Sequence, residues 1–230
     1  MVKSALVLFI ILSLSVRLHG QQSYECDNKV LAKSLEEKLS GYVLGQPLDN
    51  NQFYTNDWSE AFVTLADGST ISGEYLRYNG FLDKFIWLKK NTNQQLILND
   101  EIIEKVDLIP VKQTGTSYFE RIKVKRWYDK DSVSVFLEVL TVGPVSLYAQ
   151  RKISASQSSN EFMGEYIYFI KTINTPLVVF KPRKRNLLAA LGEYEDECKN
   201  ALKKSNLSVS DEFELIRAVE YLNSTVDFKN

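Results

Sequence analysis

The feature that most constrains the fold of this chain is a series of short apolar, β-prone segments between residues 58 and 180. Asn, Asp, Gly, Pro and Ser separate these segments at spacings of roughly 10 to 15 residues, without an amphipathic helical pattern between them. Parallel strands need a long crossover connection, so this spacing predicts antiparallel neighbours. We therefore expect one antiparallel β meander, arranged as a sheet, a clamp or an open barrel. Its later segments are 85–88, 96–98, 102–109, 118–127, 133–142, 145–153, 162–173 and 177–180.

Two dipeptides indicate turns inside this region. Asp67-Gly68 lies between β-prone runs and predicts a type I′ hairpin turn, which places Gly68 at positive φ. Asn79-Gly80 predicts a second turn with positive φ. Basic and apolar residues alternate over 121–125, as in a strand with one solvated face.

Helical patterns occupy both ends of the chain. Val30, Leu31, Leu35 and Leu39 recur at helical spacing and predict a short N-terminal helix. After residue 180, the spacing predicts two or three C-terminal helices: one that stops at Gly192, one over 194–204, and a last one capped by Ser210 with Leu215, Val219 and Leu222 on one stripe. Helices this short need tertiary burial, so we expect an α+β fold with the helices packed on the sheet.

Residues 1–20 have the pattern of a secretory signal peptide. Lys3 precedes an apolar run of about a dozen residues, too short for a membrane span of ~20 residues. We expect cleavage after Gly20, a soluble protein in the periplasm or outside the cell, and no transmembrane segment after signal removal. The predicted organisation is 1–20 signal peptide, 21–57 N-terminal helix and lead-in segment, 58–180 antiparallel β region, and 181–230 C-terminal helical segment packed on the same domain.

Composition excludes several kinds of chemistry. The single histidine, His19, lies in the predicted signal peptide, so the exported protein lacks the usual base of Ser, Cys and metal-assisted hydrolysis. The formal net charge of −1 gives no overall attraction to nucleic acid, and export also argues against that partner. We expect no catalytic residue of these classes, no metal site and no cofactor.

The chain has two cysteines, Cys26 and Cys198. In an oxidising compartment such a pair can form a disulfide, and closing so long a loop would stabilise the fold by roughly 5 kcal/mol in the chain-entropy model. The alternative is two separate thiols, because sequence does not give their separation.

Two groups of residues are candidate binding sites. Arg77, Tyr78 and Asn79 combine a cation, an aromatic ring and an amide, which suits a small anion or a sugar; the alternative is a purely structural role. A possible anion patch combines two basic segments, provided that the sheet brings them together; the alternative is two solvated surfaces. Its residues are Arg121, Lys123, Lys125, Arg183, Lys184 and Arg185.

Four short motifs resemble a broad group of uncharacterised exported, β-rich proteins of Bacteroidetes-type bacteria. They are the strand and turn from Trp58 to Asp67-Gly68, then Leu76-Arg77-Tyr78-Asn79, Val145-Ser146-Leu147-Tyr148, and the ending from Asp211 to Tyr221-Leu222-Asn223. Members commonly have two adjacent tyrosines before this last Asn, whereas here Leu222 follows Tyr221. The resemblance implies export and a β-rich fold, and no activity.

We therefore expect a non-catalytic binding or interaction protein of the cell envelope. Its partner would be an envelope component or a small anionic ligand. The alternative is a hydrolase or isomerase that uses carboxylates and lysine.

Overall fold

The computed structural model of the chain describes residues 39, 41–43, 48–110, 115–156 and 161–228. Within it, Gly41–Asn230 form one compact unit. The predicted signal peptide, Cys26 and all but the last residue of the predicted N-terminal helix lie outside the described residues. No helix in the described part of the chain is both long and apolar enough to cross a membrane.

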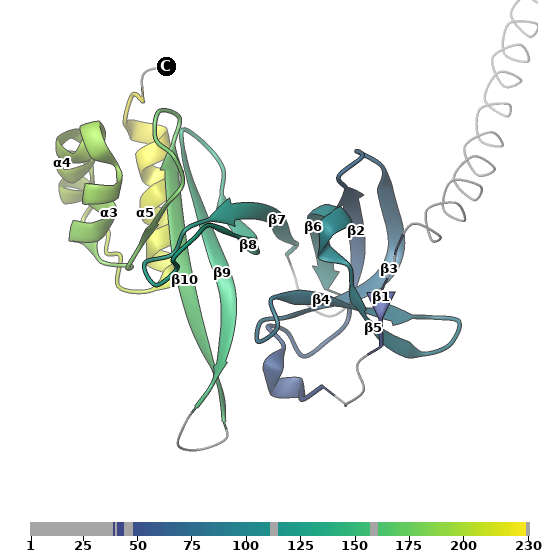
Figure 1. Cartoon of the computed structure of the whole chain (residues 1–230). Helices are drawn as coiled ribbons and strands as arrows, with labels where there is room; N and C mark the ends of the chain where they lie inside the picture. Colours follow the sequence, from purple (N-terminus) through teal and green to yellow (C-terminus); the bar gives the residue numbers. More distant parts are fainter. Residues whose placement is uncertain (1–38, 40, 44–47, 111–114, 157–160, 229–230) are drawn as a thin grey trace, which may run out of the picture. The chain divides into compact units, whose positions relative to one another are not determined.

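The described residues contain an open sheet in which every strand pairing is antiparallel (Figure 1). This confirms the prediction of a mostly antiparallel β protein. The strand order is β1-β5-β4-β3-β2-β6-β7-β8-β9-β10-β11. The strands are β1 Gly41–Tyr42, β2 Ser59–Leu65, β3 Thr70–Asn79, β4 Lys84–Lys89, β5 Gln94–Leu98, β6 Ile103–Pro110, β7 Ser117–Val124, β8 Val133–Thr141, β9 Val145–Ala155, β10 Phe162–Thr172 and β11 Val178–Phe180.

The strand order divides the sheet into two meanders, which are joined by the pairing of β2 with β6. Strands β2 to β5 follow one another as neighbours, and β6 then returns to pair with the free side of β2. Between β5 and β6 lies the short 3₁₀ turn η2, Asp100–Ile102, and another, η1, Asn50–Gln52, precedes β2. From β6 to β11 each strand pairs with the next one in the chain.

Helices near the C-terminus are also confirmed. They are α3 Lys184–Ala190, α4 Glu195–Ser205 and α5 Glu212–Thr225, with the 3₁₀ turn η3 Gly192–Tyr194 between the first two. Gly192 follows α3 with φ of 61°, as a residue that stops a helix requires. The cap of α5 differs by one residue from the prediction: the side chain of Asp211, not Ser210, accepts the hydrogen bond from the Glu214 N–H.

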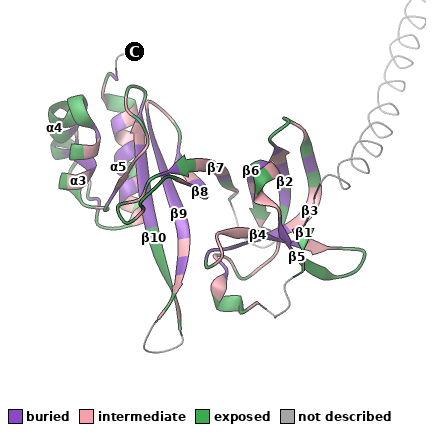
Figure 2. Ribbon diagram, in the orientation of Figure 1, coloured by how far each residue is buried: buried purple, intermediate pink, exposed green. Residues whose placement is uncertain are grey.

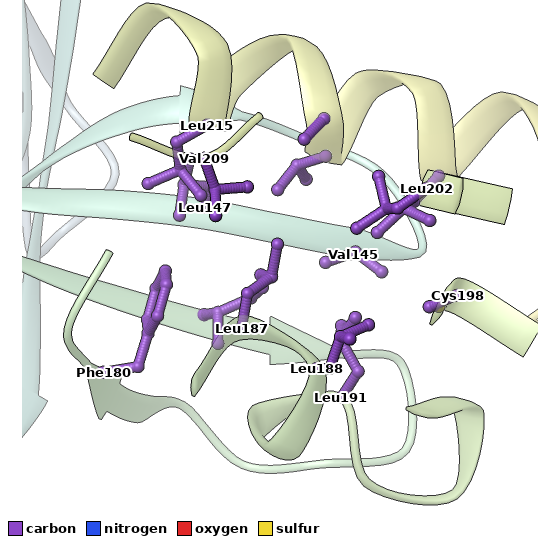
Figure 3. Packing of buried hydrophobic residues seen from close by; sticks show 14 of the residues in the cluster. Val145, Leu147, Phe180, Leu187, Leu188, Leu191, Cys198, Leu202, Val209 and Leu215 are labelled. Carbon is purple, nitrogen blue, oxygen red and sulfur yellow. The ribbon is translucent and has the colours of Figure 1, made fainter. Parts of the chain in front are cut away.

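Strand β9 and the second half of β10 are buried on both faces, because alternate side chains enter two different cores. Leu147 and Tyr168 belong to a cluster with the helices, in which α5 contributes the predicted stripe of Leu215, Val219 and Leu222. Figure 3 shows side chains of α3 and α5 pointing toward those of β9. The next residues along the strands face the other way, into a cluster with β7 and β8. Figure 2 shows burial along most of β9 and along the second half of β10, whereas the first half of β10 is exposed.

The turn at Asp67-Gly68 is of a different type from the predicted one. Gly68 has φ of 80°, as expected, but Asp67 does not have positive φ, so the turn is not type I′. Instead, the Gly68 N–H bonds to the Leu65 carbonyl and the Leu65 N–H to the Ser69 carbonyl, which is a three-residue loop closed by a left-handed glycine.

At Gly80 the prediction of a positive-φ turn is wrong, because Asp83 adopts that conformation instead. Gly80 is needed for close packing. A Cβ atom there would lie 2.2 Å from the carbonyl oxygen of Arg151, and the Ile153 N–H donates to the Gly80 carbonyl at 3.0 Å. Gly80 therefore lets the loop after β3 approach the backbone of β9.

Candidate functional site

A pocket of about 440 Å³ lies where β6, β7 and the end of β8 adjoin. The β6–β7 register pairs Lys105 with Glu120 and Asp107 with Tyr118. Since side chains alternate between the faces of a strand, these four side chains share one face. Leu140 and Val142 add apolar walls. The volume is in the range of small-molecule sites, and the lining combines apolar walls with a few polar groups.

A β-bulge shapes one wall of this pocket. In the β8–β9 pairing, Val139 faces Tyr148 and Thr141 faces Leu147, so the register shifts between these two pairs. Bulges re-aim side chains, and here all of the residues from Val139 to Val142 line the pocket. Thr141, at the end of β8, follows this register shift.

The Thr141 hydroxyl has no hydrogen-bond partner among the described residues, although its side chain is only 7% exposed. A buried hydroxyl without a partner costs roughly 1–3 kcal/mol, so native proteins seldom keep one without a use. Thr141 is also one of the residues that line the pocket, so its side chain is a candidate contact for a bound molecule.

Charge in the pocket is nearly balanced. The Lys105 ammonium lies 3.3 Å from Glu120 Oε1, so these two groups compensate each other. Asp107 is half-buried, and desolvation raises the pKa of its carboxyl while Lys105 opposes that shift. The Tyr118 ring is 51% exposed and offers a flat apolar face with a hydroxyl at its end. The pocket therefore presents the Asp107 carboxylate and the Tyr118 ring, and the unpartnered Thr141 hydroxyl is buried within its wall.

The predicted binding residues Arg77, Tyr78 and Asn79 lie elsewhere, in β3, and all three are buried. The Arg77 guanidinium donates to the Thr55 carbonyl at 3.0 Å and stacks on the Phe53 ring, 3.8 Å from its centroid. Burial lowers the pKa of Arg77, and Asp57 opposes this effect. Arg77 thus holds the 50–55 segment against the sheet, and a ligand at Arg77, Tyr78 and Asn79 stays a prediction.

Tyr78 and Asn79 are likewise engaged inside the fold. The Tyr78 hydroxyl donates to Asp83, and its ring packs on Phe85 and Phe119. Burial raises the pKa of Asp83 to about 6, although several hydrogen bonds and the Arg126 charge oppose the shift. The Asn79 amide oxygen accepts from the Leu82 N–H at 2.9 Å and so shapes the loop after β3.

Sequence reasoning missed a buried ionic cluster centred on Arg151, which is 2% exposed. Its guanidinium pairs with Glu138 of β8 and makes two hydrogen bonds to Glu212 of α5, at 2.5 and 3.0 Å. Two rings flank the guanidinium: Tyr54 at 4.8 Å and Tyr166 at 4.7 Å from their centroids. Burial alone lowers the pKa of Arg151, but the Glu212 hydrogen bonds and the charge of Glu138 raise it overall.

This cluster is internally satisfied. Glu212 also accepts a hydrogen bond from Tyr168 at 2.9 Å, so its carboxylate joins β9, β10 and α5. The sequence signal was an arginine inside the β-prone 145–153 run, in which Gln150 and Lys152 are its polar neighbours. We interpret the cluster as the tie between the helices, the sheet and the segment around Tyr54, not as a binding site.

The basic residues of the predicted anion patch are distributed over two places. The Arg121 guanidinium lies 3.9 Å from Asp100, which also pairs with Lys84 at 2.6 Å. Lys123 and Lys125 are exposed on β7 and just after it, and Arg183, Lys184 and Arg185 are exposed around the start of α3. Lys181 and Trp127 bring the two regions into contact: the Lys181 ammonium lies 5.8 Å from the centroid of the Trp127 ring.

The predicted disulfide finds no support in the structure. Cys198 is a free thiol on α4 with 0% exposure, packed inside the helical core, and Cys26 lies outside the described residues. Burial and the neighbouring Glu197 raise the pKa of the Cys198 thiol to about 11. A thiol of this kind is inert at neutral pH.

Comparisons with known proteins do not assign a family. No family model, no curated protein and no solved structure matches the chain. The resemblance to exported proteins of Bacteroidetes-type bacteria stays a prediction, and the function must be inferred from the geometry.

Proposed function

We propose that this chain is an exported, non-catalytic binding protein of the cell envelope whose β6–β8 pocket holds a small hydroxylated molecule, of the class of neutral sugars. The observation that carries the proposal is the Thr141 hydroxyl, which is buried in the pocket wall and lacks a partner within the described residues. Export itself rests on the signal pattern of residues 1–20.

The ligand class follows from the groups that the pocket presents. The Asp107 carboxylate accepts hydrogen bonds, and ligand hydroxyls are donors that suit it. The Thr141 hydroxyl can donate or accept. The exposed face of Tyr118 matches the apolar face of a sugar ring. Lys105 is the cation among the described residues that line the pocket, and it is already paired with Glu120, so this lining leaves no free cation for an anionic ligand.

Titration of the purified protein with a panel of neutral mono- and disaccharides, followed by calorimetry or saturation-transfer NMR, tests this proposal. We expect binding that Thr141→Val weakens by about tenfold, because the ligand loses one hydrogen bond and the shape of the site is kept. Thr70→Val is the matched control, since Thr70 is exposed at the start of β3 and away from the pocket. Primary amines serve as a second panel, and tighter binding of amines than of sugars would contradict the sugar class.

Thr141→Val has a second readout in the absence of ligand. Removing an unpartnered buried hydroxyl should leave the free energy of unfolding unchanged or raise it by about 1 kcal/mol. A variant that is at least as stable as the native protein and yet binds more weakly separates a binding role from a structural one. Substantial destabilisation would show that the hydroxyl has a partner within the fold.

A carboxylate-based hydrolase is the second candidate, because the pocket brings Asp107, Glu120 and Lys105 together. Enzymes often use carboxyl groups whose pKa is raised by burial, as it is for Asp107. Incubation with glycosidic substrates distinguishes the two candidates. Turnover that Asp107→Asn abolishes would establish the hydrolase and overturn the non-catalytic proposal.

A further inference from the structure

The last strand of the sheet, β11, has a free edge. It pairs with β10 on one side, and in the described part of the chain no strand pairs with its other side. Backbone N–H and C=O groups on such an edge can hydrogen-bond to an extended segment of another chain.

A groove of about 600 Å³ lies at this strand, and we refer to it as the β11 groove. Val178, Val179 and Phe180 of β11 line it, together with Ala189 of α3 on one side and Trp127 of the β7–β8 loop on the other. Trp127 is 52% exposed. An exposed tryptophan beside a free edge is a common anchor of protein interfaces.

The surroundings of the β11 groove are basic. The 178–190 segment has four exposed cations and no acid: Lys181, Arg183, Lys184 and Arg185. In the loop that carries Trp127, Lys125 and Lys130 are exposed, and Arg126 is neutralised by Asp129 at 2.7 Å. Asp131 is the exposed acid of this loop. Since the whole chain has a formal net charge of −1, this is a local positive region that attracts acidic partners.

We propose that the β11 groove binds an extended acidic segment of a partner protein, which adds to the sheet as a strand beside β11. Backbone hydrogen bonds give the pairing, Trp127 covers apolar side chains of the segment, and the lysines and arginines pair with its carboxylates. Short edge strands with lysines also protect proteins from aggregation. Protection alone does not need a groove or an exposed tryptophan, and both are present here.

A designed peptide that alternates Glu and Val is the probe. Its binding can be followed through tryptophan fluorescence, because Trp127 is exposed whereas Trp58 is half-buried and Trp87 is buried. We expect saturable binding with a blue shift of the emission, and an affinity that falls with added salt. Two control peptides isolate the interactions: one replaces every Glu by Lys, and the other has N-methylated peptide bonds at alternate residues and so cannot pair with a strand edge.

Charge-reversal variants test the position of the site. Lys181→Glu with Arg183→Glu should weaken binding of the Glu-Val peptide by about tenfold or more. Lys199→Glu with Lys203→Glu makes the same change in net charge on exposed positions of α4 and should leave the affinity unchanged. Trp127→Ala should remove both the fluorescence response and most of the affinity.

Four results would overturn the proposal. They are the absence of binding up to millimolar peptide, equal binding of the Lys-Val peptide, equal binding of the N-methylated peptide, and equal losses in the two charge-reversal variants. Sedimentation of the protein alone gives a further check, because self-association that the Glu-Val peptide disrupts would assign the groove to a second copy of this chain.

Discussion

Replacing Arg151 by methionine tests how much the buried ion pairs of Arg151 with Glu138 and Glu212 stabilise the packing of α5 on β8 and β9. Methionine keeps much of the side-chain length but removes the charge, so Glu138 is left buried without its cation and Glu212 loses two hydrogen bonds. Breaking a buried ion pair on one side costs about 3–5 kcal/mol. The methionine recovers part of the packing against Tyr54 and Tyr166, so we expect Arg151→Met to lower the free energy of unfolding by about 3 kcal/mol.

Urea denaturation followed by circular dichroism measures this change. Arg217→Met is the control, since Arg217 is exposed on α5, where it pairs with Glu214 at 3.1 Å and lies over the exposed Phe213 ring. This substitution should change the free energy of unfolding by no more than about 0.5 kcal/mol. In a double-mutant cycle, Glu138→Gln should cost less in the Arg151→Met background than alone, by about 1 kcal/mol or more. An Arg151→Met loss no larger than that of Arg217→Met would refute the reasoning.

Three other predictions concern single residues. Gly80→Ala should lower the free energy of unfolding by about 2–4 kcal/mol, because its Cβ would meet the Arg151 carbonyl oxygen at 2.2 Å. In the control Gly164→Ala, the new Cβ would meet the flexible Tyr166 ring at 3.2 Å, so this variant should lose less stability. Equal denaturation midpoints of the two variants would contradict this reasoning. Burial raises the pKa of Asp83 from 3.8 to about 6 in the native state, so the native state binds a proton more tightly than the unfolded chain does. The free energy of unfolding should therefore fall by about 3 kcal/mol as the pH rises from about 4 to 6.5 and this proton is lost. Asp83→Asn tolerates the same backbone conformation and should flatten that part of the stability–pH profile, whereas an unchanged profile would assign it to other groups. Cys198 should resist thiol reagents in the native protein at neutral pH and react after denaturation without reductant; a denatured protein with no reactive thiol would instead establish the disulfide.

The sequence predicts much of the architecture because local signals and tertiary structure agree over most of the chain. The run over 145–153 is a strand buried on both faces, and Leu215, Val219 and Leu222 form the buried face of α5, as their spacing indicates. Such agreement is expected where burial follows directly from a period of two or 3.6 residues.

The prediction failed where distant segments meet. Gly80 follows Asn79, and this dipeptide suggests a turn, but the approach of the Arg151 backbone is what requires glycine there. The sequence also did not indicate that Thr55 and Asp83 are the partners of Arg77 and Tyr78, whereas the predicted binding role of these residues stays untested.

The candidate pocket was also beyond the reach of local patterns. It depends on the β6–β7 register and on the bulge in β8, and neither leaves a periodic signal in the sequence. Thr141 looks like any β-branched strand residue until the bulge places its hydroxyl in a wall without a partner. Asp107 becomes a candidate only because it shares this pocket.

The central claim, that the β6–β8 pocket holds a hydroxylated ligand, is tested most directly by methyl NMR of the protein during titration with the neutral sugar that binds best in the panel. The account predicts saturable shifts of the methyl groups of Val139, Leu140, Thr141 and Val142, which line the pocket. Methyl groups of the helical core, such as those of Leu187 and Leu202, should not move. Shifts confined to other parts of the chain, or no shifts with any sugar of the panel, would contradict the claim.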